Sequence, residues 1–166
     1  KHHSERDRGD LKQGEAMSEI SALEGELAGL VFSTFTEETA LELGGLLVQA
    51  ARDERLPVVI NIRTASRTLF HAALPGASPM NDLWAQRKSA TALRFHESSL
   101  VVGLRNDKKG QTLADQGLDP AVYADHGGAV PIRVAGAGVV AVATVSGLPQ
   151  REDHAMVVTA LKRMLP

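Results

Sequence analysis

The last third of the chain carries the sequence feature that most constrains the fold. Two β-branched segments, residues 130–134 and 139–145, are separated by a Gly-Ala-Gly connection at 136–138. Valine and isoleucine favour strands, and a short glycine-containing connection between two such segments is typical of an antiparallel hairpin. Pro149 then suits the first position of a closing helix, where the N–H that proline lacks would have no partner anyway. This stretch therefore predicts strand, turn, strand and helix.

Apolar periodicity predicts the other elements. Thr36 suits a helix N-cap, and Glu37 and Glu38 follow it in the first turn, where the helix dipole favours negative charge. The remaining segments are, in order, a helix at 18–27, an edge strand at 30–32, a helix at 36–55, a hairpin of 58–63 with 67–72, a helix at 80–94 and a strand at 100–104. Because hairpins pair antiparallel strands, we expect an α/β fold with a mostly antiparallel sheet of about five strands covered by helices.

Length and composition limit the domain organisation and the partners. The 166 residues suit one domain, and Leu11 is the only sizeable apolar residue in 1–16. We therefore expect a flexible N-terminal extension at 1–16 and a single domain at 17–166. The net charge of −2 and the absence of cysteine argue against nucleic-acid binding, disulfides and thiolate chemistry. No apolar run approaches the roughly 20 residues that span a bilayer, so we expect a cytoplasmic protein without a membrane partner.

Three stretches resemble a known family. They are residues 123–128 (Tyr-Ala-Asp-His-Gly-Gly), 144–150 (Thr-Val-Ser-Gly-Leu-Pro-Gln) and the pair Asp153-His154. They are similar to a branch of the GlcG/HbpS-like family, whose domain is labelled haem-degrading and whose branch is an uncharacterised protein family. The resemblance implies a three-layer α/β (α+β) domain with a profilin-like or PAS-like sheet, often assembled into homo-oligomers. Residues 64–66 (Thr-Ala-Ser) depart from it, because a glycine is expected in that hairpin turn.

Two catalytic motifs match only in part. Residues 136–141 fit a dinucleotide fingerprint on paper, but a strand follows the glycines where the fingerprint needs a helix. Residues 145–147 (Val-Ser-Gly) are similar to a nucleophile elbow, except that Thr144 replaces the first glycine. A serine nucleophile at Ser146 also needs a base, and His126 or His154 are the candidates.

An anion pocket is the better local hypothesis. Ser146, Gly147 and the free N–H groups that open the last helix can accept a carboxylate or phosphate. Arg63 and Arg87 could lie near the same end of the sheet and supply positive charge. Gly127 and Gly128 let the backbone turn sharply beside His126.

Haem is the cofactor that the resemblance suggests, and it needs an axial ligand. The available side chains are His71, His96, His126, His154 and Tyr123, and each histidine has a structural role as its alternative.

Two function classes therefore stay open. The first is a small-ligand-binding or scaffold protein that holds haem or a small anion near a subunit interface of a homo-oligomer. Its candidate contacts are His126, Gly127, Gly128, Ser146, Gly147, His154, Arg63 and Arg87. The second is a small cofactor-independent enzyme with a histidine acid–base and Ser146 nearby. The sequence predicts no metal site and identifies no catalytic residue set.

Overall fold

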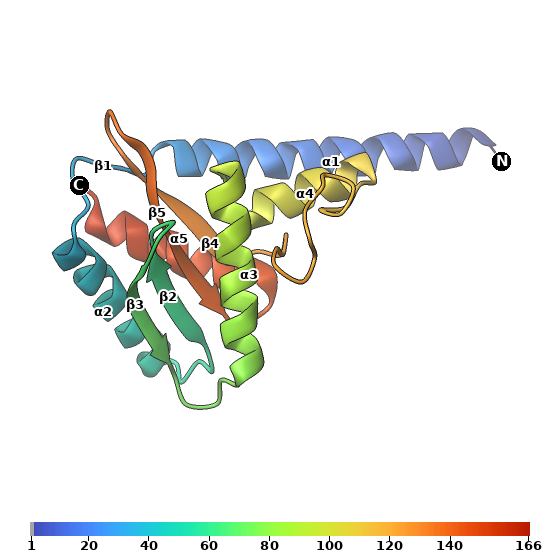
Figure 1. Cartoon of the computed structure of the whole chain (residues 1–166). Helices are drawn as coiled ribbons and strands as arrows, with labels where there is room; N and C mark the ends of the chain where they lie inside the picture. The colour runs from blue at the N-terminus through green and yellow to red at the C-terminus, as the bar shows by residue number, and fades with distance from the viewer. Residues whose placement is uncertain (1) are drawn as a thin grey trace.

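The computed structural model describes the backbone of residues 2–166 and the side chains of residues 8–166. The described residues form five helices and five strands (Figure 1). Their bounds are α1 His2–Ala28, β1 Val31–Phe32, α2 Glu37–Asp53, β2 Val59–Arg63, β3 Thr68–Ala73, α3 Pro79–Phe95, α4 Ser99–Lys109, β4 Ala129–Val134, β5 Gly138–Ser146 and α5 Gln150–Met164.

The five strands form one sheet in the order β1-β4-β5-β2-β3. The pairs β4–β5, β5–β2 and β2–β3 are antiparallel, and only the two-residue β1 runs parallel to its neighbour β4. The predicted α/β class and mostly antiparallel sheet are confirmed. The predicted closing hairpin is confirmed as well, with Val134 opposite Gly138 at the turn.

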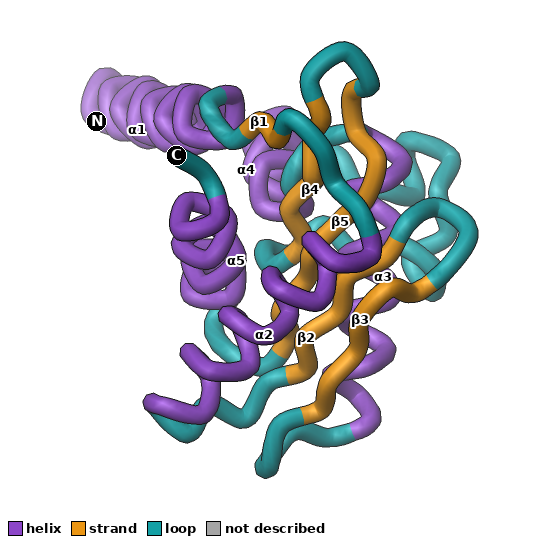
Figure 2. Tube along the Cα trace, turned by 90° about the vertical axis from the view of Figure 1, so that its left-hand side faces the viewer, coloured by secondary structure: helices purple, strands orange, loops and turns teal. Residues whose placement is uncertain are grey.

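Helices cover both faces of the sheet, as Figures 1 and 2 show from two directions: α2 and α5 pack on one face and α3 on the other. The main apolar core lies under α2 and α5, where Leu43, Leu47, Ile60 and Leu161 are almost fully buried. The α3 face has only a small apolar cluster. The sheet is therefore stabilised mainly from one side.

Polar contacts dominate the α3 face. Ser89 Oγ on α3 lies 2.8 Å from Thr144 Oγ1 on β5, and both side chains are buried. At the edge strand, His71 Nδ1 lies 3.0 Å from Asn61 Nδ2, and His71 Nε2 lies 2.8 Å from Asp82 Oδ1 on α3. Hydrogen bonds between side chains therefore help to hold α3 against the sheet.

The predicted strand at 100–104 is wrong, because this segment lies inside helix α4. The Ser98 side chain caps that helix by accepting the N–H of Val101, and Gly110 ends it in the left-handed conformation at φ 62°. Residues 100–103 are all buried and apolar, so this segment contains no polar position that would reveal its helical period. A short, wholly apolar run is compatible with a strand or a buried helix.

Helix α1 extends well beyond the predicted 18–27 segment. Its C-terminal half is tied to the domain by ion pairs of Glu19 with Arg151, Glu24 with Arg105 and Glu26 with Lys162, at 2.7–2.8 Å. Its N-terminal half projects from the body (Figure 1). Lys1 lies outside the described residues, and the division of the chain at residue 16 stays a prediction. Within the described part, no helix combines the length and apolarity that a bilayer crossing requires.

The hairpin turn at 64–66 forms without the expected glycine. The Thr64 hydroxyl accepts the N–H groups of Ser66 at 3.3 Å and Arg67 at 3.2 Å, and the Thr64 N–H donates to Arg67 O. A threonine side chain can stabilise a turn in this way without left-handed backbone.

Candidate functional site

A cleft opens where α3, the end of β5 and the start of α5 meet. It has a volume of about 260 Å³. We call it the Lys88 cleft, and its lining is Asn81, Trp84, Lys88, His126, Ser146, Gly147, Leu148, Gln150 and Asp153. The three α3 residues are spaced by three and four positions, so they project from one face of the helix.

A buried ion pair forms the wall between α3 and α5. Lys88 Nζ lies 3.0 Å from Asp153 Oδ2, and the two side chains are 5% and 1% exposed. Burial raises the pKa of the Asp153 carboxyl, because the desolvation cost of the charged form outweighs the opposing effect of the Lys88 ammonium. Such a pair is favourable only when its remaining hydrogen-bonding groups are also satisfied.

The Asp153 carboxylate meets that condition by accepting hydrogen bonds from backbone N–H groups just before its own helix, α5. Its Oδ1 accepts the N–H of Leu148 at 2.9 Å, and its Oδ2 accepts the N–H of Gly147 at 3.3 Å. The sequence analysis assigned the amide groups at this position to an external anion. In the structure, the N–H groups of Gly147 and Leu148 donate to the Asp153 carboxylate, so they are not free to bind a ligand.

The amide side chains of the cleft present their donors to it. Asn81 Oδ1 accepts the Ser78 N–H at 2.9 Å, and Gln150 Oε1 accepts the Gly127 N–H at 2.9 Å. A backbone N–H can only donate, so each contact fixes which end of the amide is the oxygen. The NH₂ groups of Asn81 and Gln150 therefore stay available. In the described part of the chain, the Ser146 hydroxyl and the His126 ring make no hydrogen bond to another residue.

Glycines allow the backbone to close around the cleft. Gly128 has φ 141°, and a Cβ there would lie 2.4 Å from Val145 O and 2.9 Å from Lys88 Nζ. Gly147 has φ 148°, and its Cβ would lie 2.4 Å from Pro57 O. No other residue fits these conformations and approaches without displacement, which explains the Gly-Gly and Ser-Gly pairs.

Five of the eight predicted site residues come together here. His126, Ser146 and Gly147 line the cleft, while Gly127 and Gly128 build the wall beside it. The His126 ring meets the Trp84 ring edge to face, with centroids 5.1 Å apart.

The three remaining predicted residues do not line the cleft. Arg87 stacks on Trp84, with Cζ 4.5 Å from the ring centroid, and donates to Pro120 O. Arg63 lies at the other end of β2, since it pairs with Val142 whereas Val59 pairs with Ser146.

His154 is buried, at 3% exposure, and neither ring nitrogen has a hydrogen-bond partner among the described residues. Burial lowers the pKa of its imidazole, and nearby Glu26 opposes this only in part. A role for His154 as a ligand contact would require the groups that cover it to move.

The other haem-ligand candidates have structural partners. His71 bonds Asn61 and Asp82, and the Tyr123 hydroxyl accepts a hydrogen bond from Arg94. His96 ends α3 in the left-handed conformation at φ 56°. Within the described residues, no three or more His, Cys, Asp or Glu side chains gather as a metal site would require.

The sequence analysis missed Asn81, Trp84, Lys88, Gln150 and Asp153 as site residues. A signal was present for the ion pair, because Lys88 lies beside the apolar face of its helix and lysine is almost never fully buried unless it is paired. Nothing in the local sequence identifies Asp153, 65 positions away, as the partner.

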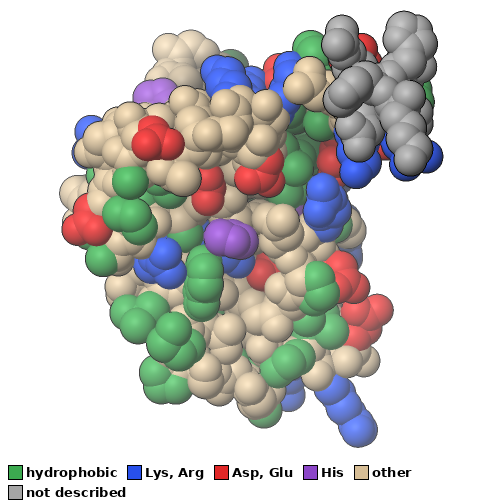
Figure 3. Space-filling model, turned by 90° about the vertical axis from the view of Figure 1, so that its right-hand side faces the viewer, with side chains coloured by type: hydrophobic (Ala, Val, Ile, Leu, Met, Phe, Trp, Pro, Cys, Tyr) green, Lys and Arg blue, Asp and Glu red, His purple; other side chains and the backbone are tan. Residues whose placement is uncertain are grey.

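The face of the molecule drawn in Figure 3 does not carry charges of one sign. Figure 3 shows the right-hand side of Figure 1, where Lys and Arg side chains are mixed with Asp and Glu side chains. Discrimination among ligands therefore depends on the groups inside the cleft.

Comparison with known proteins identifies the family. The model of the haem degrading protein HbpS-like family matches residues 35–162. A UPF0303 protein of Streptomyces coelicolor is 49% identical over 147 residues, which cover 88% of this chain and 93% of that protein. The crystal structure of the Ybr137w protein has a TM-score of 0.79 at 36% identity, covering 86% of this chain and 84% of that one. The crystal structure of HbpS has a TM-score of 0.65 at 25% identity, covering 84% of this chain and 96% of that one. The chain belongs to the HbpS-like haem-degrading-domain family, and its similar relatives carry the UPF0303 designation.

Proposed function

We propose that this chain is a small-ligand-binding protein whose ligand presents a carboxylate, a phosphate or a similar acceptor group to the Lys88 cleft. One observation carries the proposal: most of the acceptors of the cleft are used internally, whereas several of its donors are left over. Both Asp153 oxygens, Asn81 Oδ1 and Gln150 Oε1 already accept hydrogen bonds from the protein.

The donors that remain are the NH₂ groups of Asn81 and Gln150, the Ser146 hydroxyl and the third N–H of Lys88. Lys88 Nζ has three N–H donors, of which Asp153 Oδ2 takes one and Val145 O, at 3.5 Å, a second. A ligand that can only donate would find one free acceptor among these groups, the Ser146 oxygen. An acceptor-rich ligand would find several free donors.

Charge and size limit the ligand further. The Lys88–Asp153 pair is neutral as a unit, so the cleft suits one or two negative charges held by hydrogen bonds rather than a polyanion. Its volume of about 260 Å³ lies just below the range of about 300–1,000 Å³ for typical small-molecule sites. We therefore expect a ligand of a few heavy atoms.

Trp84 gives a direct test, because it is the only tryptophan in the chain and lies in the cleft. Acetate, a small dicarboxylate and inorganic phosphate would each be titrated while tryptophan fluorescence is followed. We expect a saturable change with at least one of them. Ser146→Ala should weaken that binding by about tenfold, the effect of one lost hydrogen bond to a charged group.

The control is Ser66→Ala, which makes the same chemical change in the exposed turn between β2 and β3 and should leave binding unchanged. The proposal is wrong if none of the three anions gives saturation. It is also wrong if Ser146→Ala and Ser66→Ala bind equally well.

Haem is the second candidate, because the description of the family names it. The fit in this chain is poor: the Lys88 cleft is too small to enclose a porphyrin, and the larger groove between α2 and α5 has no histidine in its lining. Only His126, exposed at the lip, could contact haem from the cleft side. A haem titration followed at the Soret band tests this. Haem binding at the cleft requires a Soret shift that His126→Ala removes and His96→Ala leaves intact.

The enzyme alternative rests on His126 and Ser146, which line the same cleft. A nucleophile needs hydrogen-bond contact with its base, and the base in turn needs an orienting group. No hydrogen bond joins His126 to Ser146 among the described residues, so the geometry favours binding. Assembly into a homo-oligomer is also a proposal, and light scattering on the purified chain tests it.

A further inference from the structure

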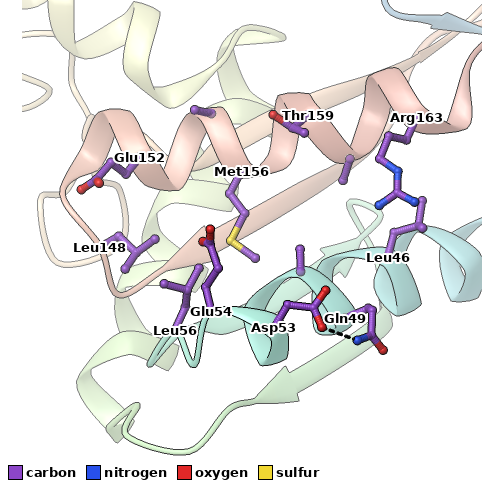
Figure 4. Close-up of a pocket in the computed structure, with 13 residues that line it drawn as sticks. Leu46, Gln49, Asp53, Glu54, Leu56, Leu148, Glu152, Met156, Thr159 and Arg163 are labelled. Carbon is purple, nitrogen blue, oxygen red and sulfur yellow. Dashed lines mark hydrogen bonds between the residues drawn. The ribbon is translucent and has the colours of Figure 1, made fainter.

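We propose that the groove between α2 and α5 is a second binding site, distinct from the Lys88 cleft, and that it docks a basic amphipathic helix of a partner protein. The groove has a volume of about 560 Å³, roughly twice that of the cleft. Figure 4 shows it from the side, with both helices running along it.

The floor of the groove is apolar in a place where a surface helix normally carries polar residues. α2 contributes Leu46 and Ala50, four positions apart, in addition to its fully buried stripe of Leu43, Leu47 and Ala51. α5 contributes Met156, which points into the space between the helices in Figure 4. Leu56 and Leu148 close one end. This second stripe is not needed to cover the sheet, so it is available to a partner.

The charges around the groove are distributed unevenly between its two ends, and this distribution determines which charges a partner must carry. Glu54 and Glu152 lie at one end, while Arg163 lies beside Leu46 at the other end (Figure 4). Asp53 adds a third carboxylate, bonded by Gln49 at 2.7 Å. Glu54, Glu152 and Arg163 form no ion pair with any other described residue. α2 also ends at this position, and the C-terminus of a helix carries partial negative charge.

The shape fits a helix better than an extended peptide. An extended peptide binds by adding a strand to a sheet edge, whereas this groove is bounded by two helices whose backbone groups are already bonded. An apolar channel between helices accepts side chains spaced by three and four residues from a third helix. The matching partner carries an apolar stripe flanked by Lys or Arg at the end that meets Glu54 and Glu152.

Two synthetic peptides of about 18 residues, long enough to form helix in solution, test the proposal. Both carry the same leucine stripe; one has lysines on its flanks and the other has glutamates. Fluorescence anisotropy of labelled peptide against the full chain should show the lysine peptide binding at least about tenfold more tightly. The proposal is overturned if the two peptides bind equally or if neither binds.

Charge-reversed variants locate the site. Glu54→Lys combined with Glu152→Lys should weaken the binding of the lysine peptide by about tenfold or more and strengthen the binding of the glutamate peptide. The control is Glu15→Lys on α1, an exposed position that does not line the groove, which should leave both affinities unchanged.

The same variants separate a heterologous partner from a second copy of the chain. If neither peptide binds and the double variant lowers the mass measured by light scattering, the groove is an interface between copies, and the proposal fails. Ser146→Ala separates the two sites, because Ser146 lines the Lys88 cleft and not the groove: it should weaken anion binding and leave the affinity for the lysine peptide unchanged.

Discussion

Lys88 Nζ and Asp153 Oδ2 lie 3.0 Å apart, and this buried contact joins the middle of α3 to the first turn of α5 across 65 positions of sequence. The two helices pack on opposite faces of the sheet, and the pair forms the wall of the cleft where they meet at the end of β5. The stability of this ion pair and the shape of the cleft are therefore linked.

Removing one partner of the pair should lower the free energy of unfolding markedly. Lys88→Met leaves the Asp153 carboxylate buried and unpaired, and we expect a loss of about 3–5 kcal/mol in the free energy of unfolding at neutral pH. The pKa of Asp153 is already raised and should rise further without the lysine, so the loss should shrink as the pH falls and the carboxyl protonates.

A double-mutant cycle in urea with Asp153→Asn, which keeps an oxygen for the Leu148 N–H, measures the coupling. We expect an interaction free energy of about 1–3 kcal/mol. Strict additivity of the two single changes would show that the pair contributes nothing as a pair.

Two glycines with left-handed backbone should respond differently to alanine. At Gly128 a Cβ would lie 2.4 Å from Val145 O, whereas at Gly136, with φ 78°, nothing lies within 4 Å. Gly136→Ala should cost only the backbone strain of about 1–2 kcal/mol. Gly128→Ala adds a steric clash of similar or larger size. Chemical denaturation compares the two, and equal losses would contradict the close packing around the cleft.

Two adjacent glycines in α2 should give effects of opposite sign. A Cβ at Gly45 meets nothing within 4 Å, whereas a Cβ at Gly44 would lie 2.5 Å from the Phe70 ring. Gly45→Ala should stabilise the protein by about 0.5–1 kcal/mol through helix propensity. Gly44→Ala should destabilise it by about 1–3 kcal/mol, because the Phe70 ring must move. Melting temperatures test the order, and stabilisation by both changes would place α2 farther from β3.

His154 should make the fold sensitive to acid. Its folded-state pKa is lowered from the ordinary value of 6.5 by burial, so the unfolded chain binds a proton before the folded chain does. The stability contribution is complete above pH 6.5 and declines as the pH falls below that value. The slope is at most about 1.4 kcal/mol per pH unit.

His154→Leu should remove this slope between about pH 6.5 and the lowered folded-state pKa. The exposed His126→Ala should retain it. Urea midpoints at several pH values measure both. An unchanged slope in His154→Leu would mean that another group is responsible.

Much of the fold follows from local patterns in the sequence. The glycine turn at 136–138 and the Thr36 cap predict elements that the structure contains, because each is set by residues within a few positions. The segment at 100–104 was misassigned because it is wholly apolar and residues 100–103 are buried, so it has no polar position that distinguishes a helix from a strand. The flanking signals Ser98 and Gly110 would have predicted the helix.

The candidate site was only partly predictable for a related reason. His126, Ser146 and Gly147 stand in a recognisable sequence context, and the structure brings them together. The partner of Lys88 depends on a contact across 65 positions, which no local pattern encodes. The occupation of the Gly147 and Leu148 amides by Asp153 likewise depends on side-chain geometry.

The unequal faces of the sheet have a consequence for how such a protein can diversify. Since the large apolar core lies under α2 and α5, substitutions in the polar layer beneath α3 leave most of the buried apolar contacts unchanged. Descendants of one ancestral scaffold could therefore exchange the chemistry of that layer while the platform beneath it persists.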